Sequence, residues 1–115
     1  MARGARLERL DAHRAELEAE YRTALIAALR ITATGKTGLF GHSLDKPSRL
    51  RMAALGDPII ALGEEIDAMR SQLGIEPFAL HGEFLASRGR PQSPQAVGEA
   101  RQAQQWLSRL EATGA

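Results

Sequence analysis

The apolar residues in the first third of the chain recur at alternating spacings of three and four, the period of one face of an α-helix. Between residues 4 and 34 this seam consists of Leu7, Leu10, Arg14, Leu17, Tyr21, Ala24, Ala28 and Ile31. Arg14 is the one position that interrupts it. Such a seam is typical of a helix packed lengthwise against another helix. The spacing therefore predicts a long helix, which Gly35 is expected to end as a left-handed cap.

A second seam with the same spacing occupies residues 47–73. It consists of Met52, Leu55, Ile59, Leu62, Ile66, Met69 and Leu73. Pro58 lies inside it and allows two interpretations. Either the helix breaks and restarts with Asp57 as N-cap and Pro58 at the first position, or the helix kinks and keeps the seam in phase. Gly74 is expected to end this helix.

Two helices of matching length joined by residues 35–46 are expected to lie antiparallel. Leu39 and Phe40 are two adjacent large apolar residues of this connection, and we expect them to plug the end of the hairpin core. Pro77 is expected to open a third helix over about 77–88. The segment GRPQSP, residues 89–94, has the composition of a linker. Ser93 and Pro94 are expected to cap a last helix that runs to about Ala112.

The sequence therefore predicts an all-α fold, in which a long antiparallel helical hairpin carries two shorter helices. The expected divisions are a hairpin with the third helix over 1–88, a linker over 89–94 and a C-terminal helix over 95–115. If two copies pair, their hairpins would form a four-helix bundle.

Composition narrows the classes of function. The chain of 115 residues fits one domain, and its 15 basic residues nearly balance 14 acidic ones, so charge does not indicate a nucleic-acid or membrane partner. The absence of Cys excludes disulfides, zinc fingers and thiol nucleophiles. The N-terminus carries charge where a signal peptide needs an apolar core, and no apolar run is long enough to span a membrane. We expect a cytoplasmic protein.

The stretch ITATGKTGLFGHS contains the letters GKT, which also end a phosphate-binding loop. That loop needs a glycine at position 30, which is Arg30 here, and it must follow a strand and open a helix. This GKT instead follows a helix. We expect a helix cap and a turn, with no bound nucleotide and no cofactor.

The candidate residues for chemistry are few. The histidines His13, His42 and His81 are dispersed, and an enzyme or metal centre would have to gather His42, Asp45 and His81. The acids Glu64, Glu65 and Asp67 alternate with seam residues, so they are expected to be solvated, with Asp67 paired to Arg70 or to nothing. We expect no catalytic residue and no metal.

The stretch MRSQLGIEPFALHGEF, residues 69–84, resembles the helix-turn-helix pattern, with Gly74 in the turn. Arg70 and Glu83 depart from it, because a small and an apolar residue are normal there. The resemblance implies a nucleic-acid binder using residues 62–88. The phosphate contacts would come from Arg3, Arg6, Arg88 and Arg90. A phage small-terminase-like adaptor is similar in architecture, since it joins an oligomerising hairpin to a DNA-binding helical unit.

The remaining candidate is an apolar surface for a protein partner. The residues proposed for it are Leu25, Ile26, Leu29, Leu39, Phe40 and Ile60. They either lie beneath the third and fourth helices or pair with a second copy of the chain. We expect a small non-catalytic, adaptor-type protein that binds itself or another protein through apolar helix faces, with nucleic-acid binding as the alternative.

Overall fold

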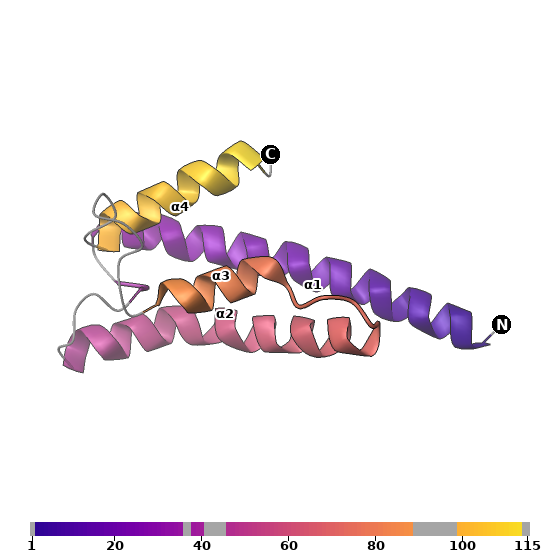
Figure 1. Cartoon of the computed structure of the whole chain (residues 1–115). Helices are drawn as coiled ribbons and strands as arrows, with labels where there is room; N and C mark the ends of the chain where they lie inside the picture. The colour runs from indigo at the N-terminus through magenta and orange to yellow at the C-terminus, as the bar shows by residue number, and fades with distance from the viewer. Residues whose placement is uncertain (1, 36–37, 41–45, 89–98, 114–115) are drawn as a thin grey trace.

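The structure, a computed structural model, describes residues 2–35, 38–40, 46–88 and 99–113, and these ranges contain helices and no strand. The helices are α1 (Ala2–Ala33), α2 (Lys46–Gln72), α3 (Ala79–Ser87) and α4 (Glu99–Thr113). α1 and α2 run antiparallel, and α3 turns back along α2 (Figure 1). The predicted all-α hairpin with two shorter helices is confirmed. The four-helix bundle of two copies stays a prediction.

Glycines end both long helices, as predicted. Gly35 and Gly74 have φ angles of 82° and 71°, a left-handed conformation that costs glycine little. The Gly74 N–H donates to the Ser71 carbonyl at 3.1 Å, and the Ile75 N–H donates to the Arg70 carbonyl at 3.0 Å. These two bonds form a Schellman motif, which satisfies the last carbonyls of α2 and stops the helix there.

The buried face of α1 drifts away from the predicted seam. The buried positions are Leu17, Tyr21, Leu25, Ala28, Leu29 and Thr32. Ile31, predicted to lie on the seam, is 46% exposed, so this prediction is wrong. A straight helix of 3.6 residues per turn rotates about 20° per heptad relative to a strict seven-residue repeat. By the end of α1 this rotation places Thr32, rather than Ile31, on the buried face. The Thr32 hydroxyl donates to the Ala28 carbonyl at 3.0 Å.

Pro58 lies inside α2, which continues unbroken through it. The predicted restart, with Asp57 as N-cap, is wrong. The helix is continuous and keeps its seam in phase, as the alternative expected, and the kink of that alternative stays a prediction. Proline cannot donate to the carbonyl four residues earlier, here that of Ala54. Ala54 and Pro58 are both exposed, whereas Ile59 is buried on the core side. The defect therefore faces water, which can satisfy the free carbonyl.

The core closes at the end of the hairpin where α1 joins α2. Leu39 and Phe40 are completely buried there, as predicted. The Phe40 ring packs against Trp106 of α4 and Phe84 of α3, with centroids 6.0 and 6.4 Å apart. Three segments distant in sequence thus meet in one aromatic cluster, and the edge-to-face contact between Phe40 and Phe84 stabilises the core beyond burial alone.

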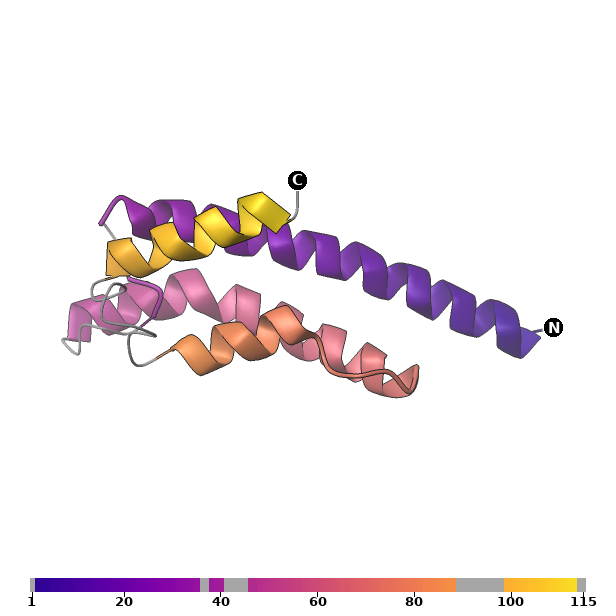
Figure 2. The same ribbon diagram turned by 45° about the horizontal axis from the view of Figure 1, so that its top comes forward.

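α3 is shorter than the predicted 77–88, whereas α4 ends at Thr113, close to the predicted end at about Ala112. α3 begins at Ala79 rather than at Pro77, because Phe78 has an extended backbone. Ser93, Pro94 and the linker 89–94 lie outside the described residues. α2 and α4 both pack against α1, and α3 lies beside α2 (Figure 2).

Candidate functional site

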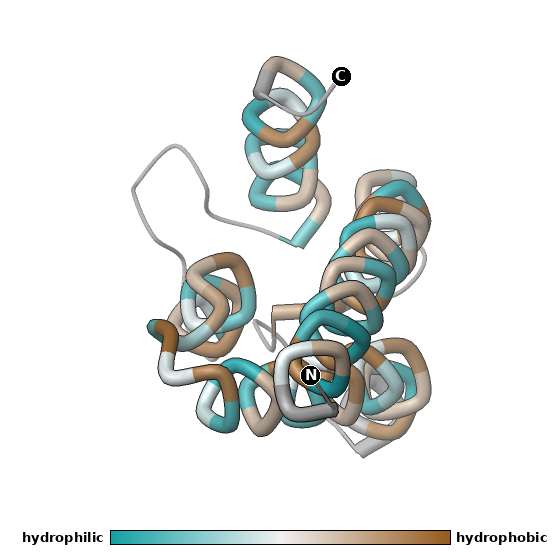
Figure 3. The backbone as a smooth tube through the Cα atoms, turned by 90° about the vertical axis from the view of Figure 1, so that its right-hand side faces the viewer, coloured by the Kyte–Doolittle hydropathy of each residue, from teal (hydrophilic) through white to brown (hydrophobic). Residues whose placement is uncertain are grey.

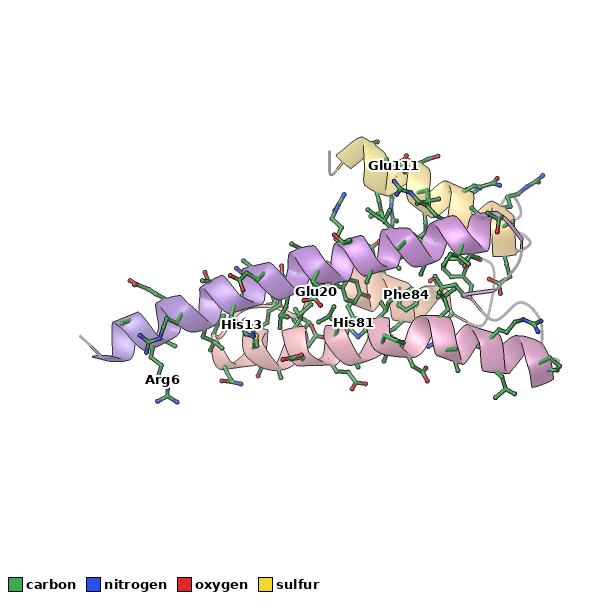
Figure 4. The ribbon with its side chains drawn as sticks, turned by 180° about the vertical axis from the view of Figure 1, so that it is seen from behind. Arg6, His13, Glu20, His81, Phe84 and Glu111 are labelled. Atoms are coloured by element: carbon green, nitrogen blue, oxygen red, sulfur yellow. The ribbon has the colours of Figure 1, made fainter. Side chains whose placement is uncertain are left out.

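A buried polar contact joins α1 to α3. The Tyr21 hydroxyl lies 2.9 Å from Nδ1 of His81, and the two rings meet edge to face. Both side chains are buried, with exposed fractions of 0% and 1%. In Figure 4, His81 points inward between the long helices. Phe78 packs edge-on against the other side of the Tyr21 ring, with centroids 5.2 Å apart.

Gly63 of α2 makes room for this pair. A Cβ atom at Gly63 would overlap the His81 ring, so the imidazole rests directly on the α2 backbone. Burial lowers the pKa of His81, although the carboxylates of Asp67 and Glu64 oppose the shift. Burial, reinforced by Asp67, raises the pKa of Tyr21 well above its ordinary value. The pair is therefore neutral near pH 7, and the tautomer of the His81 ring sets which of the two atoms donates the hydrogen bond.

This arrangement suits a structural role better than catalysis. A general acid or base needs a pKa near the working pH and access to substrate, and the buried phenol of Tyr21 has neither. His42 and Asp45, the other members of the hypothetical centre, lie outside the described residues. Within the described part of the chain, no group of three or more potential ligands could hold a metal ion.

A charged network crosses the hairpin beside this pair. Arg70 of α2 donates two hydrogen bonds, of 2.7 and 3.1 Å, to the carboxylate of Glu18 of α1. Arg14 contacts the same carboxylate at 2.9 Å. Burial would raise the pKa of Glu18, but the hydrogen bonds from Arg70 and Arg14 outweigh it, so the pKa is lowered. Arg14, which interrupts the apolar seam, is thus an ion-pair partner. The i, i+4 spacing of Arg14 and Glu18 is the sequence signal for it.

Asp67 has a different partner from the one expected. Its Oδ1 accepts the Phe78 N–H at 2.8 Å, at the start of α3, while Arg70 binds Glu18 instead. Asp67 is half-buried, so the prediction that it is solvated is wrong, whereas Glu64 and Glu65 are exposed. A carboxylate near the first free N–H groups of a helix stabilises its N-terminus, so Asp67 holds α3 against α2.

The residues proposed for a partner surface are largely covered from within the chain. Leu25, Leu29, Leu39 and Phe40 are completely buried, and Ile26 and Ile60 are half-buried against the same core. That core also contains Phe84 of α3 and Trp106 of α4. The arrangement corresponds to the alternative in which the third and fourth helices cover these positions, and it leaves Ile26 and Ile60 partly accessible.

Arg6 and Arg88, the two arginines of the nucleic-acid alternative whose side chains the structure describes, do not share one surface. Arg6 is exposed near the N-terminal end of α1, and Arg88 lies beyond the far end of α3, with its guanidinium 5.9 Å from the Phe84 ring. The Arg3 side chain and Arg90 lie outside the described positions. α3 is separated from α2 by residues 73–78 and runs back alongside it, unlike the short turn and steep crossing of a helix-turn-helix. Nucleic-acid binding stays a prediction.

A groove runs between α3 and α4 over the surface of α1. Viewed along the long axis of the molecule, α4 stands apart from α3 (Figure 3). The groove has a volume of about 610 Å³ and includes Phe78, Leu80 and Leu110. Glu83 and Arg109 form an ion pair across it at 2.7 Å, and both are half exposed. The groove is shallow, and its polar groups do not converge on one point.

The N-terminal part of α1 extends past the end of α2. We call residues 4–13 the α1 overhang. Arg6 lies beyond the last turn of α2, whereas His13 lies over it (Figure 4). Leu7 is 44% exposed and Leu10 is half-buried, although both lie on the seam that packs against α2 farther along. An open cavity of about 660 Å³ is lined by Arg6, Leu7, Arg9, Leu10, His13 and Gln72.

Comparisons with protein-family models, with curated proteins and with solved structures find no match to this chain. None of the described helices combines the length and the apolar character needed to cross a membrane.

Proposed function

We propose that the protein is a small non-catalytic interaction module, which binds a second copy of itself or another protein through an apolar helix face. The observation that supports this function is the α1 overhang. It carries two leucines on the packing seam, at 7 and 10, yet Leu7 keeps 44% of its surface exposed. Covering a leucine contributes up to roughly 1.5–3 kcal/mol, so a helix laid along this face would be stabilised.

The remainder of the molecule acts as a rigid support for that face. The Arg14–Glu18–Arg70 network and the Tyr21–His81 bond fix α1 to α2 and α3 immediately beside the overhang. A binding helix that is already ordered loses less conformational entropy on association. In this proposal these polar contacts hold α1 in place for binding.

The test uses the full chain and two matched variants. Leu7→Glu places a charge on the overhang, and Ile31→Glu makes the same change at an equally exposed position, 46% against 44%, at the other end of α1. We expect wild type and Ile31→Glu to self-associate in sedimentation velocity or to retain a stoichiometric partner from a lysate of the source organism. Leu7→Glu should lose that association. A wild-type monomer that retains no partner would overturn the proposed function.

A further inference from the structure

α3 is held in place by a few side chains. It has nine residues, of which His81, Phe84 and Ser87 are buried. A helix of this length is marginal in water by itself, and Gly82 in its middle lowers its helix propensity further. The position of α3 against the long helices therefore depends on what these buried side chains contact.

The other helices are joined by contacts that do not involve α3. Arg70 of α2 binds Glu18 of α1. Glu99 of α4 accepts two N–H groups of the hairpin connection, and Arg22 of α1 donates to the Leu110 carbonyl of α4 at 2.6 Å. A region with few buried contacts opens locally at a lower free energy than the whole chain. These contacts can therefore persist when α3 leaves its place.

His81 is the polar anchor of α3, and it lies in a buried site formed by three helices. Its Nδ1 lies 2.9 Å from the Tyr21 hydroxyl of α1, and its ring rests on the backbone of Gly63 of α2. His81, Tyr21 and Gly63 are all buried. Among the described residues, Tyr21 is the hydrogen-bond partner of the ring. The site therefore suits an uncharged imidazole.

A proton on His81 would place a cation in this site. The bond to Tyr21 can survive protonation, because a phenol oxygen can accept from a protonated Nδ1, but the charge is kept from water. The carboxylates of Glu64 and Asp67 on α2 favour the charged ring, yet burial outweighs them and lowers the pKa of His81. Glu64 is exposed, and Asp67 accepts the Phe78 N–H at 2.8 Å, so neither carboxylate pairs directly with the ring.

The other charged groups of the surrounding helices do not compensate this cation. Arg70 of α2 is bonded to Glu18 of α1, and Glu83 of α3 pairs with Arg109 of α4. The helix dipole adds to the cost, because His81 lies in the first turn of α3, where a cation is destabilised. Moving outward with α3 returns the charged ring to water.

We propose that α3 is an acid-released element: protonation of His81 frees α3 from the α1–α2 hairpin, with residues 73–78 as the hinge, while α1, α2 and α4 stay packed. Residues 74–77 are exposed, so their movement disturbs no core contact. Release uncovers Phe84 and the side of Phe40 that packs against it. This release does not depend on binding at the α1 overhang.

Release of α3 is coupled to uptake of a proton. Once released, His81 is in water and binds a proton with the ordinary pKa of 6.5, which is higher than the lowered pKa of the docked ring. The equilibrium constant for release therefore rises as the pH falls below about 6.5, by up to about tenfold per pH unit, until the docked ring is protonated as well. Above that pH the ring is neutral in both states and α3 remains docked.

The test is amide hydrogen exchange of the full chain, followed by NMR between about pH 7.5 and 5.5 at several low urea concentrations and corrected for the intrinsic exchange rate. The α3 amides, such as that of Gly82, which donates to the Phe78 carbonyl, should be less protected than those of α2 and should respond more weakly to urea. Below about pH 6.5 their protection should fall by up to about tenfold per pH unit. Equal protection and equal urea dependence in α3 and α2, or protection of α3 that does not change with pH, would overturn the release of α3.

Two histidine variants form a matched pair for the same measurement. His81→Gln can still bond to Tyr21 but does not titrate, so the protection of α3 should become independent of pH. His13→Gln removes an exposed histidine of α1 and should keep the wild-type dependence. A pH dependence that persists in His81→Gln, or that is lost in His13→Gln, contradicts the assignment to His81. If His81→Gln does not fold, the wild-type series and the His13→Gln control still decide, because each of their outcomes supports or overturns the release.

Discussion

The Tyr21 hydroxyl and Nδ1 of His81 lie 2.9 Å apart in the interior, although the two residues are 60 positions apart in sequence. The bond joins α1 to α3 at the point where His81 also rests on the α2 backbone at Gly63. One hydrogen-bonded pair therefore fixes the relative positions of three helices.

Removing the hydroxyl tests the strength of this connection. Tyr21→Phe keeps the ring but leaves Nδ1 of the buried His81 without its hydrogen-bond partner, which should lower the free energy of unfolding by about 1–3 kcal/mol. Urea denaturation followed by circular dichroism measures the change. Glu20→Ala, at the exposed neighbouring position, should change the stability by less than about 0.5 kcal/mol. Equal effects of the two substitutions would contradict the burial of the pair.

The lowered pKa of His81 predicts a loss of stability in mild acid. The folded chain binds the proton less readily than the unfolded chain, whose histidine has the ordinary pKa of 6.5. Stability from the neutral ring is therefore complete above about pH 6.5 and falls as the pH drops below it. The pKa of Glu18 is also lowered in the folded chain, from an ordinary value of 4.5, so protonation of this carboxylate at lower pH removes further stability.

The measurement is the free energy of unfolding between about pH 7.5 and 5.5. Over this range the titration of carboxylates does not yet dominate the change in stability. The wild type should lose stability across this range, and His81→Gln should show a shallower slope, because its amide can still accept from Tyr21 but does not titrate. Parallel slopes in the two proteins would mean that His81 is protonated as easily in the folded state as in the unfolded one.

Two glycines in helices provide a matched pair of substitutions. Gly63→Ala pushes a methyl group into the His81 ring, and we expect a loss of at least about 2 kcal/mol from overpacking and from the displaced hydrogen bond. Gly82→Ala meets no atom within 4 Å, and should stabilise α3 by up to about 1 kcal/mol through helix propensity. Thermal unfolding compares them. The prediction fails if Gly63→Ala is as stable as Gly82→Ala.

The carboxylate of Glu99 should be needed for closing the hairpin. Its Oε2 accepts the N–H groups of Leu39 and Phe40 at 3.0 and 2.9 Å. Glu99→Ala leaves these donors without that acceptor and should lower the free energy of unfolding by about 1–3 kcal/mol. Glu99→Gln keeps one oxygen as acceptor, so its stability should lie between those of Glu99→Ala and the wild type. Glu111→Ala on the same helix breaks an exposed pair with Arg30, 3.6 Å long, and should cost less than about 0.5 kcal/mol. Denaturant midpoints of the three variants should follow this order.

The long helices could be predicted because their apolar spacing and their end glycines are local properties of the sequence. Ile31 was misplaced because a strict heptad differs slightly from the true helical repeat, and the difference accumulates along a straight helix. Pro58 was ambiguous because its effect depends on whether the freed carbonyl faces water, which requires knowing what packs on the other side.

The polar contacts could not be predicted from the sequence, for a different reason. Arg14 and Glu18 carry an i, i+4 signal, but nothing local indicates that Arg70 completes the network, and the Tyr21–His81 pair has no spacing rule at all. Such contacts depend on how three helices come together. The same limit applies to Leu25 and Leu29, whose apolar character is visible in the sequence while the elements that cover them are distant along it.

The aromatic cluster has a consequence for synthesis of the chain. Phe40 leaves the ribosome long before Trp106, its ring neighbour in α4. Until α4 has been synthesised, Leu39 and Phe40 lack the packing that α4 provides. Their backbone N–H groups also lack the Glu99 carboxylate as an acceptor. Domains generally fold as units during translation, so cooperative folding here must wait for the final segment, and the nascent hairpin stays exposed to chaperones until then.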